Sequence, residues 1–180
     1  MQRTREQIED ETLTIRAMKG SAEALDQLLS RWQKRLWNYL FGQCRNEQVA
    51  WDLLQETCLS IASGIQKLKE PNSFPQWTFR LAHRRYVDWV RKDARASETK
   101  AQVAEQAKVD ATGSKDGLAQ LRAAIEQLEP RDRAVITLTY VEGFSYEEIA
   151  ASLELPVGTV KSRIHQAKQR IREIIGKKQP

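Results

Sequence analysis

Two carboxylates one helical turn apart, Asp52 and Glu56, are the residues whose type and spacing could hold a divalent metal ion. Such a site needs further carboxylates or histidines, and the whole chain contains only two histidines. Its two cysteines, Cys44 and Cys58, belong to no CxxC motif or Cys/His cluster, and we interpret them as buried or unreactive thiols. The sequence therefore predicts no catalytic residue, no metal site and no cofactor, which argues against an enzyme.

The stretch PVGTVKSRIHQAKQR has the residue types of a DNA-reading helix. Residues 156–178 contain seven basic residues and one acidic residue, whereas residues 118–155 contain three basic and seven acidic residues. The donors and acceptors near the start of the basic segment are Lys161, Ser162, His165 and Gln166. Such side chains can contact base edges or phosphates in the major groove. We therefore predict a recognition helix, the alternative being a solvated basic helix on a bundle.

A helix-turn-helix is expected to position these side chains. Ser145 and Glu148 form an S-x-x-E capping box at the start of a first, acidic helix, and Pro156 suits the first turn of the second. The apolar residues that pack the two helices are Ile149, Ala150, Leu153, Leu155, Val160, Ile164, Ala167 and Ile171. Glu154 occupies the turn position that is often glycine, which requires an unfavourable backbone conformation or a different turn. We expect the acidic helix to support the basic one and to face protein.

A second informative stretch, FPQWTFRLAHRRYVDWVRKDAR, combines aromatic and basic residues in one expected helix. Residues 77–95 contain six Arg or Lys residues and two Asp residues. At about 100° per residue, the apolar face comprises Phe79, Ala82, Tyr86, Trp89 and Val90. The opposite side carries Arg80, Arg84 and Arg91, close to Trp77. Basic residues beside an aromatic ring suit unpaired bases, whereas a core tryptophan and solvated arginines are the structural alternative.

Composition divides the chain into two expected domains and a linker. Residues 96–117 contain no Leu, Ile, Phe, Trp or Tyr, and such a segment cannot bury enough apolar surface to offset its ordering entropy. We therefore predict an all-α protein with two small helical domains, residues 1–95 and 118–180, joined by a flexible linker. The helices are expected near residues 11–19, 21–43, 46–66, 75–94, 116–128, 131–142, 146–153 and 157–175.

Overall composition fits this interpretation. The chain has 180 residues, of which 41% are hydrophobic and 29% charged, and a formal net charge of +5. A pI of about 9.3 fits a nucleic-acid or other acidic partner. The N-terminus has no apolar core like that of a signal peptide, and no apolar run reaches membrane-spanning length. We expect a cytoplasmic protein without membrane insertion.

Three blocks, taken in their order, give the chain a family resemblance. The blocks are AWDLLQETCLSIA, FPQWTFRLAHRRYVDWVRK and LEPRDRAVITLTYVEGFSYEEIAASLELPVGTVKSRIHQAKQRIREII. This order resembles the ECF-type (group IV) sigma factors of bacterial RNA polymerase, over nearly the whole chain apart from the first ten residues and the linker. The last block is the most specific and resembles sigma region 4. The D-x-x-Q-E run at Asp52, Gln55 and Glu56 is similar to its counterpart in region 2.

The resemblance implies a role for each domain. Region 2, a helical bundle, would bind the clamp of core RNA polymerase through Asp52, Gln55 and Glu56. It would also melt the −10 promoter element with the loop at 66–76 and the helix that follows. The side chains implied in −10 binding are Trp77, Arg80, Arg84, Arg85 and Arg91. Those implied in reading the −35 element from the region 4 helix-turn-helix are Lys161, Ser162, Arg163, His165 and Gln166.

The resemblance also implies partners. An alternative sigma factor binds core polymerase at its clamp and flap, binds promoter DNA both double-stranded and melted, and is held inactive by an anti-sigma factor. The chemistry would belong to the polymerase. The alternative function is a DNA-binding regulator that acts without polymerase and uses residues 1–95 for ligand sensing or dimerisation.

Some positions depart from the family pattern. Arg84 stands where the family often has Asn, and His165 and Gln166 stand where Phe and Arg are frequent, so the base preferences are expected to differ. Ser60, Ala62 and Gly64 replace bulkier residues, and we expect looser packing there.

Overall fold

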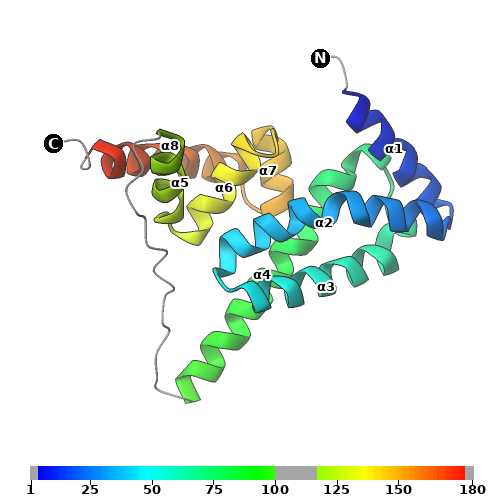
Figure 1. The fold of residues 1–180 in the computed structure, drawn as a ribbon, viewed down its shortest axis with the longest axis horizontal. Helices are drawn as coiled ribbons and strands as arrows, with labels where there is room; N and C mark the ends of the chain where they lie inside the picture. Colours follow the sequence, from blue (N-terminus) through cyan, green and yellow to red (C-terminus); the bar gives the residue numbers. More distant parts are fainter. Residues whose placement is uncertain (1–3, 100–116, 177–180) are drawn as a thin grey trace.

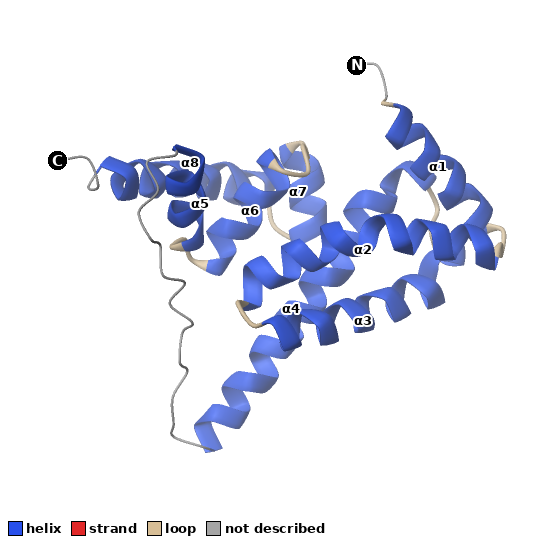
Figure 2. Ribbon diagram, in the orientation of Figure 1, coloured by secondary structure: helices blue, strands red, loops and turns tan. Residues whose placement is uncertain are grey.

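The computed structural model describes residues 4–99 and 117–176, and within these ranges it contains helices and turns but no strand (Figure 2). The N-terminal bundle comprises α1 (Arg5–Met18), α2 (Ala22–Cys44), α3 (Glu47–Gly64) and α4 (Phe74–Thr99). The C-terminal bundle comprises α5 (Gly117–Glu126), α6 (Pro130–Tyr140), α7 (Tyr146–Leu153) and α8 (Val157–Gly176). The all-α prediction is confirmed. Most of the predicted linker lies outside the described residues.

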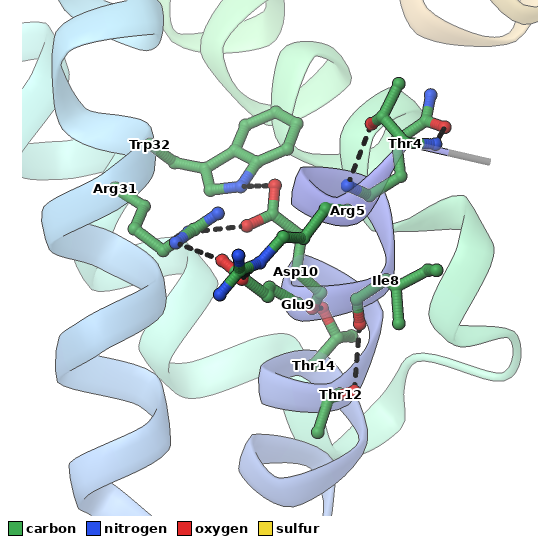
Figure 3. Close-up of polar contacts among 10 residues, drawn as sticks. Thr4, Arg5, Ile8, Glu9, Asp10, Thr12, Thr14, Arg31 and Trp32 are labelled. Atoms are coloured by element: carbon green, nitrogen blue, oxygen red, sulfur yellow. Dashed lines mark hydrogen bonds and ion pairs between the residues drawn. The ribbon is translucent and has the colours of Figure 1, made fainter.

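The first helix begins earlier than expected, at Arg5. Thr4 and Gln7 form a capping box that satisfies the free N–H groups of its first turn, a T-x-x-Q signal that the sequence prediction missed. Asp10 then fixes α1 to α2, because its carboxylate accepts hydrogen bonds from Trp32 Nε1 at 3.0 Å and Arg31 Nε at 2.7 Å (Figure 3).

The core of the N-terminal bundle is aromatic and lies where α2 and α4 meet. Trp32, Tyr39, Phe74 and Phe79 are almost fully buried. Phe79 meets both Trp32 and Tyr39 edge-on, with ring centroids 6.2 and 5.3 Å apart. Such edge-to-face pairs add to the stability that area burial provides. Of the expected apolar stripe on α4, Phe79 and Ala82 are buried, whereas Val90 is exposed.

Two short 3₁₀ helices, η1 (Ile65–Lys67) and η2 (Pro71–Ser73), form the connection between α3 and α4 that was predicted as a loop. Gly64 ends α3 directly beneath Trp77. A Cβ at this glycine would lie 3.0 Å from Trp77 Cζ2, so a larger residue would displace the ring. Packing at Gly64 is therefore tight, contrary to the expectation of looser packing.

The helix-turn-helix of the C-terminal bundle agrees closely with its prediction. Both hydrogen bonds of the Ser145–Glu148 capping box are present, at 3.2 and 2.7 Å. Glu154 ends α7 in the left-handed region, with φ 56° and ψ 46°, the unfavourable backbone that the turn demands. Pro156 lies just before α8, where its carbonyl accepts hydrogen bonds from Thr159 N and Val160 N. The apolar stripe of α8 is buried against α6 and α7.

The two bundles pack against each other, which the sequence did not predict. α7 lies along α4 and α6 lies against α2, although each pair is far apart in sequence (Figure 1). One hydrophobic cluster runs through both bundles. Phe144, in the turn before α7, meets Phe79 of α4 edge-on, with centroids 5.5 Å apart. The two bundles thus share one apolar cluster, and a second, smaller cluster lies within the C-terminal bundle.

Candidate nucleic-acid interface

The exposed side of α8 carries the predicted reading residues. Lys161, Ser162, His165 and Gln166 are all exposed on one face of the helix. Val160 and Ile164 are buried on the other side and hold the helix against its bundle. This arrangement leaves a continuous row of donors and acceptors free to enter a groove. Their spacing at i, i+1, i+4 and i+5 follows from the helical repeat.

Arg163 does not join this face. Its side chain is only partly exposed, and its charge acts on His83 of α4 and Asp132 of α6. It therefore lies toward the N-terminal bundle, away from the row formed by the other four residues. The structure thus brings together four of the five residues predicted for the −35 contact.

One face of α4 presents Gln76, Arg80 and Arg84 at successive helical turns, and α7 packs beside it, so that Gln76 and Arg80 are partly buried while Arg84 stays exposed. Arg84 donates both its Nε, at 3.1 Å, and an Nη to the carboxylate of Glu154. This hydrogen-bonded pair raises the pKa of Arg84 and lowers the pKa of Glu154. Arg80 adds to the lowering of the Glu154 pKa through its charge. Two of the arginines predicted to bind DNA therefore face a carboxylate of the same chain.

Two further contacts link the same regions of the bundles. Gln76 Nε2 donates to the Glu148 carboxylate. Arg35 of α2 donates to Glu142, with Nε at 2.9 Å from Oε2, and its guanidinium lies 4.0 Å from the centre of the Trp32 ring. The Glu142 side chain is only 5% exposed, so its charge is neutralised inside the contact between the bundles.

The other residues predicted for −10 contact lie apart from this face. Trp77 is half-buried against Gly64. Arg85 points toward α3, where it donates to Ser60 Oγ at 2.8 Å, and Arg91 lies 3.9 Å from Asp88. The predicted set therefore divides into Arg80 and Arg84 beside α7 and the remaining residues on other sides of α4.

The predicted clamp-binding residues are exposed together on α3. Asp52, Gln55 and Glu56 all face solvent. The sequence prediction missed their apolar neighbours Trp51 and Leu59, which are 50% and 65% exposed. The signal that could have found them is the i, i+4, i+8 spacing of residues 51, 55 and 59 on one helical face.

A groove of about 430 Å³ runs between α3 and α4 beside these residues. Asp52 and Glu56 line one wall, and Arg85 and Lys92 line the other. The groove is therefore mixed in charge and suits a protein surface better than a polyanion.

The remaining side chains that could take part in chemistry are His83, Cys44 and Cys58, and all three are partly buried. Burial lowers the pKa of His83 to about 4, and its Nδ1 lies 3.0 Å from the Tyr39 hydroxyl. Burial also raises the pKa of the Cys44 and Cys58 thiols, which disfavours the reactive thiolate. In the described ranges no group of three or more possible metal ligands occurs. No helix within those ranges is long and apolar enough to cross a membrane.

Comparison with known proteins matches both bundles. The family model Sigma-70 region 2 matches residues 28–96, and the model Sigma-70, region 4 matches residues 118–171. The chain is 32% identical over 161 residues to the ECF RNA polymerase sigma factor SigE of Mycolicibacterium smegmatis, which covers 84% of this chain and 62% of SigE. It is 29% identical over 167 residues to the RNA polymerase sigma factor CarQ of Myxococcus xanthus, covering 87% and 92% of the two chains. The chain thus spans less than two thirds of SigE and most of CarQ.

Solved structures share the fold. The sigma factor RpoE from Bartonella quintana, in complex with the anti-sigma factor NepR, is similar with a TM-score of 0.72 and 24% identity over 84% of this chain and 96% of that chain. CnrH, in complex with the cytosolic domain of CnrY, gives a TM-score of 0.68 and 24% identity over 94% and 99%. With both family models matched in order and relatives named as ECF sigma factors, this chain belongs to the ECF sigma factors of bacterial RNA polymerase.

Proposed function

We propose that this protein is an alternative-sigma transcription initiation factor that binds core RNA polymerase, recognises −35 and −10 promoter elements and helps to melt the −10 region. The observation that carries this proposal is the succession of a region 2 match and a region 4 match on one chain, the second with an exposed polar face on its recognition helix. A DNA-binding regulator that acts alone would have no use for the first.

Reading of the −35 duplex is assigned to α8. Lys161 and Ser162 are placed to contact phosphates or base edges near the start of the helix, and His165 and Gln166 lie one turn further on. Arg163 would reach a phosphate only if its side chain turned away from the bundle. This assignment makes duplex binding strongly dependent on salt, because the basic side chains release counterions.

Capture of the melted −10 strand is assigned to the loop at 66–76 and to the face formed by Gln76, Arg80 and Arg84, which we call the −10 face. Trp77, Arg85 and Arg91 would contribute at its margins. Opening a duplex exposes bases and phosphates that an arginine-rich helix beside an aromatic ring can hold. Because α7 packs beside the −10 face and Glu154 pairs with Arg84, the strand would have to compete with α7 and its flanking carboxylate for this face.

Binding of core polymerase is assigned to two surfaces. Asp52, Gln55 and Glu56 would contact the clamp, and the exposed Trp51 and Leu59 would supply the apolar part of the same surface. The C-terminal bundle would contact the flap. Two weak sites joined by a linker gain affinity from their high effective concentration. We place the domain boundaries at residues 95 and 118.

Regulation and location complete the proposal. One solved structure that shares this fold, RpoE, is in complex with the anti-sigma factor NepR, and another, CnrH, is in complex with the cytosolic domain of CnrY, which supports a regulatory partner of this kind for this protein. We place the protein in the bacterial cytoplasm, where core polymerase works, and assign it no catalysis of its own.

Run-off transcription with purified core polymerase tests the proposal. The template would be the DNA fragments that are recovered with the protein from cells. Wild-type protein should stimulate a discrete transcript, whereas the variant Asp52→Lys/Glu56→Lys should bind core polymerase weakly while its circular dichroism stays native. Lack of stimulation by the wild-type protein would refute the sigma function, and undiminished core binding by the variant would refute the clamp assignment.

A further inference from the structure

We infer that the acidic edge of the C-terminal bundle, formed by Glu142, Glu148 and Glu154, is an interaction surface whose partner is the −10 face of the same chain together with Arg35 of α2. While the bundles are packed together, Glu148 and Glu154 occupy hydrogen-bonding groups of Gln76 and Arg84 that would otherwise bind the melted strand, and Glu142 helps to hold the bundles in place. The closed chain should therefore bind single-stranded DNA more weakly than the open chain. This inference rests on the proposed function for the meaning of the −10 face, but the contacts themselves do not depend on it.

Each carboxylate of the acidic edge accepts a hydrogen bond from the N-terminal bundle. Glu142 accepts from Arg35, and Glu154 accepts from Arg84 through two nitrogens. Glu148 accepts from Gln76. The Ser152 hydroxyl also lies 3.3 Å from the Gln76 carbonyl oxygen. The donors thus meet acceptors that lie before, within and directly after α7.

A carboxylate is a good substitute for a phosphate at an arginine. Both are anionic oxygen acceptors that take paired N–H donors from one guanidinium. Arg84 uses Nε and an Nη on Glu154, and this leaves fewer of its donors for a DNA phosphate. The acidic edge therefore competes with the strand for the same hydrogen bonds.

Contacts outside the exposed ion pairs supply most of the closing energy. The Arg84–Glu154 pair is about half exposed on both sides, and such pairs contribute little alone. Phe144 packs on Phe79 inside the shared core. Arg133, which is 7% exposed, donates to the Gly42 carbonyl of α2. The apolar and buried contacts thus hold the bundles together, and the acidic edge determines which side chains are covered.

The reading face of α8 is left free by this packing. Lys161, Ser162, His165 and Gln166 stay exposed while α7 packs beside the −10 face. Closing should therefore weaken the binding of single strands and leave the binding of duplex unchanged. If only open molecules bind the single strand tightly, the apparent affinity is reduced in proportion to the fraction of molecules that are open.

A charge reversal at Glu142 tests the inference on the full chain. Glu142→Lys places a cation against Arg35, whereas Glu147→Lys makes the same charge change at an exposed site on α7 that does not face the N-terminal bundle. Spin labels at Ala62 and Gln169, both exposed, would report the distance between the bundles after Cys44 and Cys58 are replaced by serine and alanine.

The distance measurement has clear outcomes. Wild type and Glu147→Lys should share one narrow distance distribution, and Glu142→Lys should give a longer and broader one. The swap Arg35→Glu/Glu142→Lys should restore the narrow distribution. If Glu142→Lys unfolds, as judged by circular dichroism, the milder variant Glu142→Gln, which removes the partner charge of Arg35, should give the longer and broader distribution in its place. A distance that stays the same in both tests overturns the inference.

Fluorescence anisotropy with a labelled, mixed-sequence oligonucleotide supplies the second readout. If closed molecules outnumber open ones about ten to one, Glu142→Lys should bind the single strand about tenfold tighter than Glu147→Lys. Duplex binding of the two variants should be equal. Opening without this gain in single-strand affinity would overturn the inference even if transcription is normal. If the distances and the single-strand affinities come out as expected but run-off transcription fails, only the proposed function is refuted.

Discussion

The exposed face of α8 and the −10 face of α4 are both basic, yet their surroundings differ. Lys161 and His165 face solvent without an ion-pair partner among the described residues, whereas Arg84, although about half exposed, pairs with Glu154 at the end of α7. The same composition therefore serves as a free surface in one bundle and as half of an internal contact in the other. The difference shows that a basic helix has to be interpreted together with the acidic segments of its own chain.

The acidic segment responsible is adjacent to the basic helix in sequence. Residues 118–155 contain seven acidic and three basic residues, and three of the acidic ones form the edge that faces α2 and α4. A segment that supports a recognition helix thus also covers the opposite bundle. Four experiments test the contrast between the paired face of α4 and the free face of α8.

The largest effect is expected from Phe79→Ala, beneath the paired face. Phe79 is fully buried against Trp32, Tyr39 and Phe144, and its removal should lower the free energy of unfolding by about 3–5 kcal/mol. Urea denaturation followed by circular dichroism measures this loss. Phe144→Ala, at the junction of the bundles, should cost less and should lengthen the distance between the bundles. Equal losses for both variants would contradict the placement of the junction.

Acid should lower the free energy of unfolding through His83 of α4, whose pKa of about 4 lies below its ordinary value of 6.5. Above pH 6.5 this residue is neutral in both the folded and the unfolded chain. Between pH 6.5 and 4 only the unfolded chain takes up the proton, so the free energy of unfolding should fall by up to about 1.4 kcal/mol per pH unit. Below pH 4 the effect should level off.

The variant His83→Gln isolates this contribution, because the carboxylates titrate in both proteins. The difference between the two curves of unfolding free energy against pH should slope between pH 6.5 and 4. The charged and titratable neighbours are Tyr39 on α2, Tyr86 on α4, Glu154 after α7 and Arg163 on α8. A flat difference curve would show that His83 is solvated and that the paired face is open.

An intermediate effect is expected at Arg133, which joins the bundles from α6. Its guanidinium donates to the Gly42 carbonyl and, at 2.6 Å, to the Leu128 carbonyl. Arg133→Ala leaves these acceptors without their donor and should cost about 1–3 kcal/mol of unfolding free energy. Arg131→Ala, an exposed arginine on the same helix, is the matched control and should be near neutral in urea denaturation. Equal stability of both variants would remove Arg133 from the contact.

The smallest effects on stability are expected on the free face. Lys161→Ala and His165→Ala should leave thermal unfolding unchanged, because both side chains are exposed. Their duplex affinity should fall by about tenfold for each lost contact to a base or phosphate, and the Lys161 variant should also reduce the salt slope by about one. Electrophoretic mobility shift on recovered promoter fragments measures this. Unchanged binding by both variants would refute the reading face.

Local sequence signals predicted the helices well. The Ser145–Glu148 box starts α7 as expected, because this cap depends on residues only three positions apart. Of the two alternatives predicted at Glu154, an unfavourable backbone or a different turn, the structure has the first, a left-handed conformation. The earlier start of α1 was missed although Thr4 and Gln7 carry the same kind of signal.

The docking of the bundles could not be predicted. Arg84 and Glu154 are 70 positions apart, and Arg35 and Glu142 are 107 apart, so no local pattern pairs them. The helical repeat placed Arg80 and Arg84 on one face correctly but gave no sign of what covers that face. Gly64 was likewise interpreted as loose packing because the ring that fills its space, Trp77, belongs to the next helix.

Glu154 has a consequence for how this protein could evolve or be engineered. Its left-handed backbone disfavours any residue with a side chain by roughly 1 kcal/mol, so glycine would relieve the turn. Glycine would also delete the carboxylate that holds Arg84. A selection for heat resistance would therefore favour the very codon change that uncovers the α4 arginines. Thermal stability would favour glycine at this position, whereas the pairing with Arg84 requires glutamate. The protein has the residue that keeps Arg84 paired.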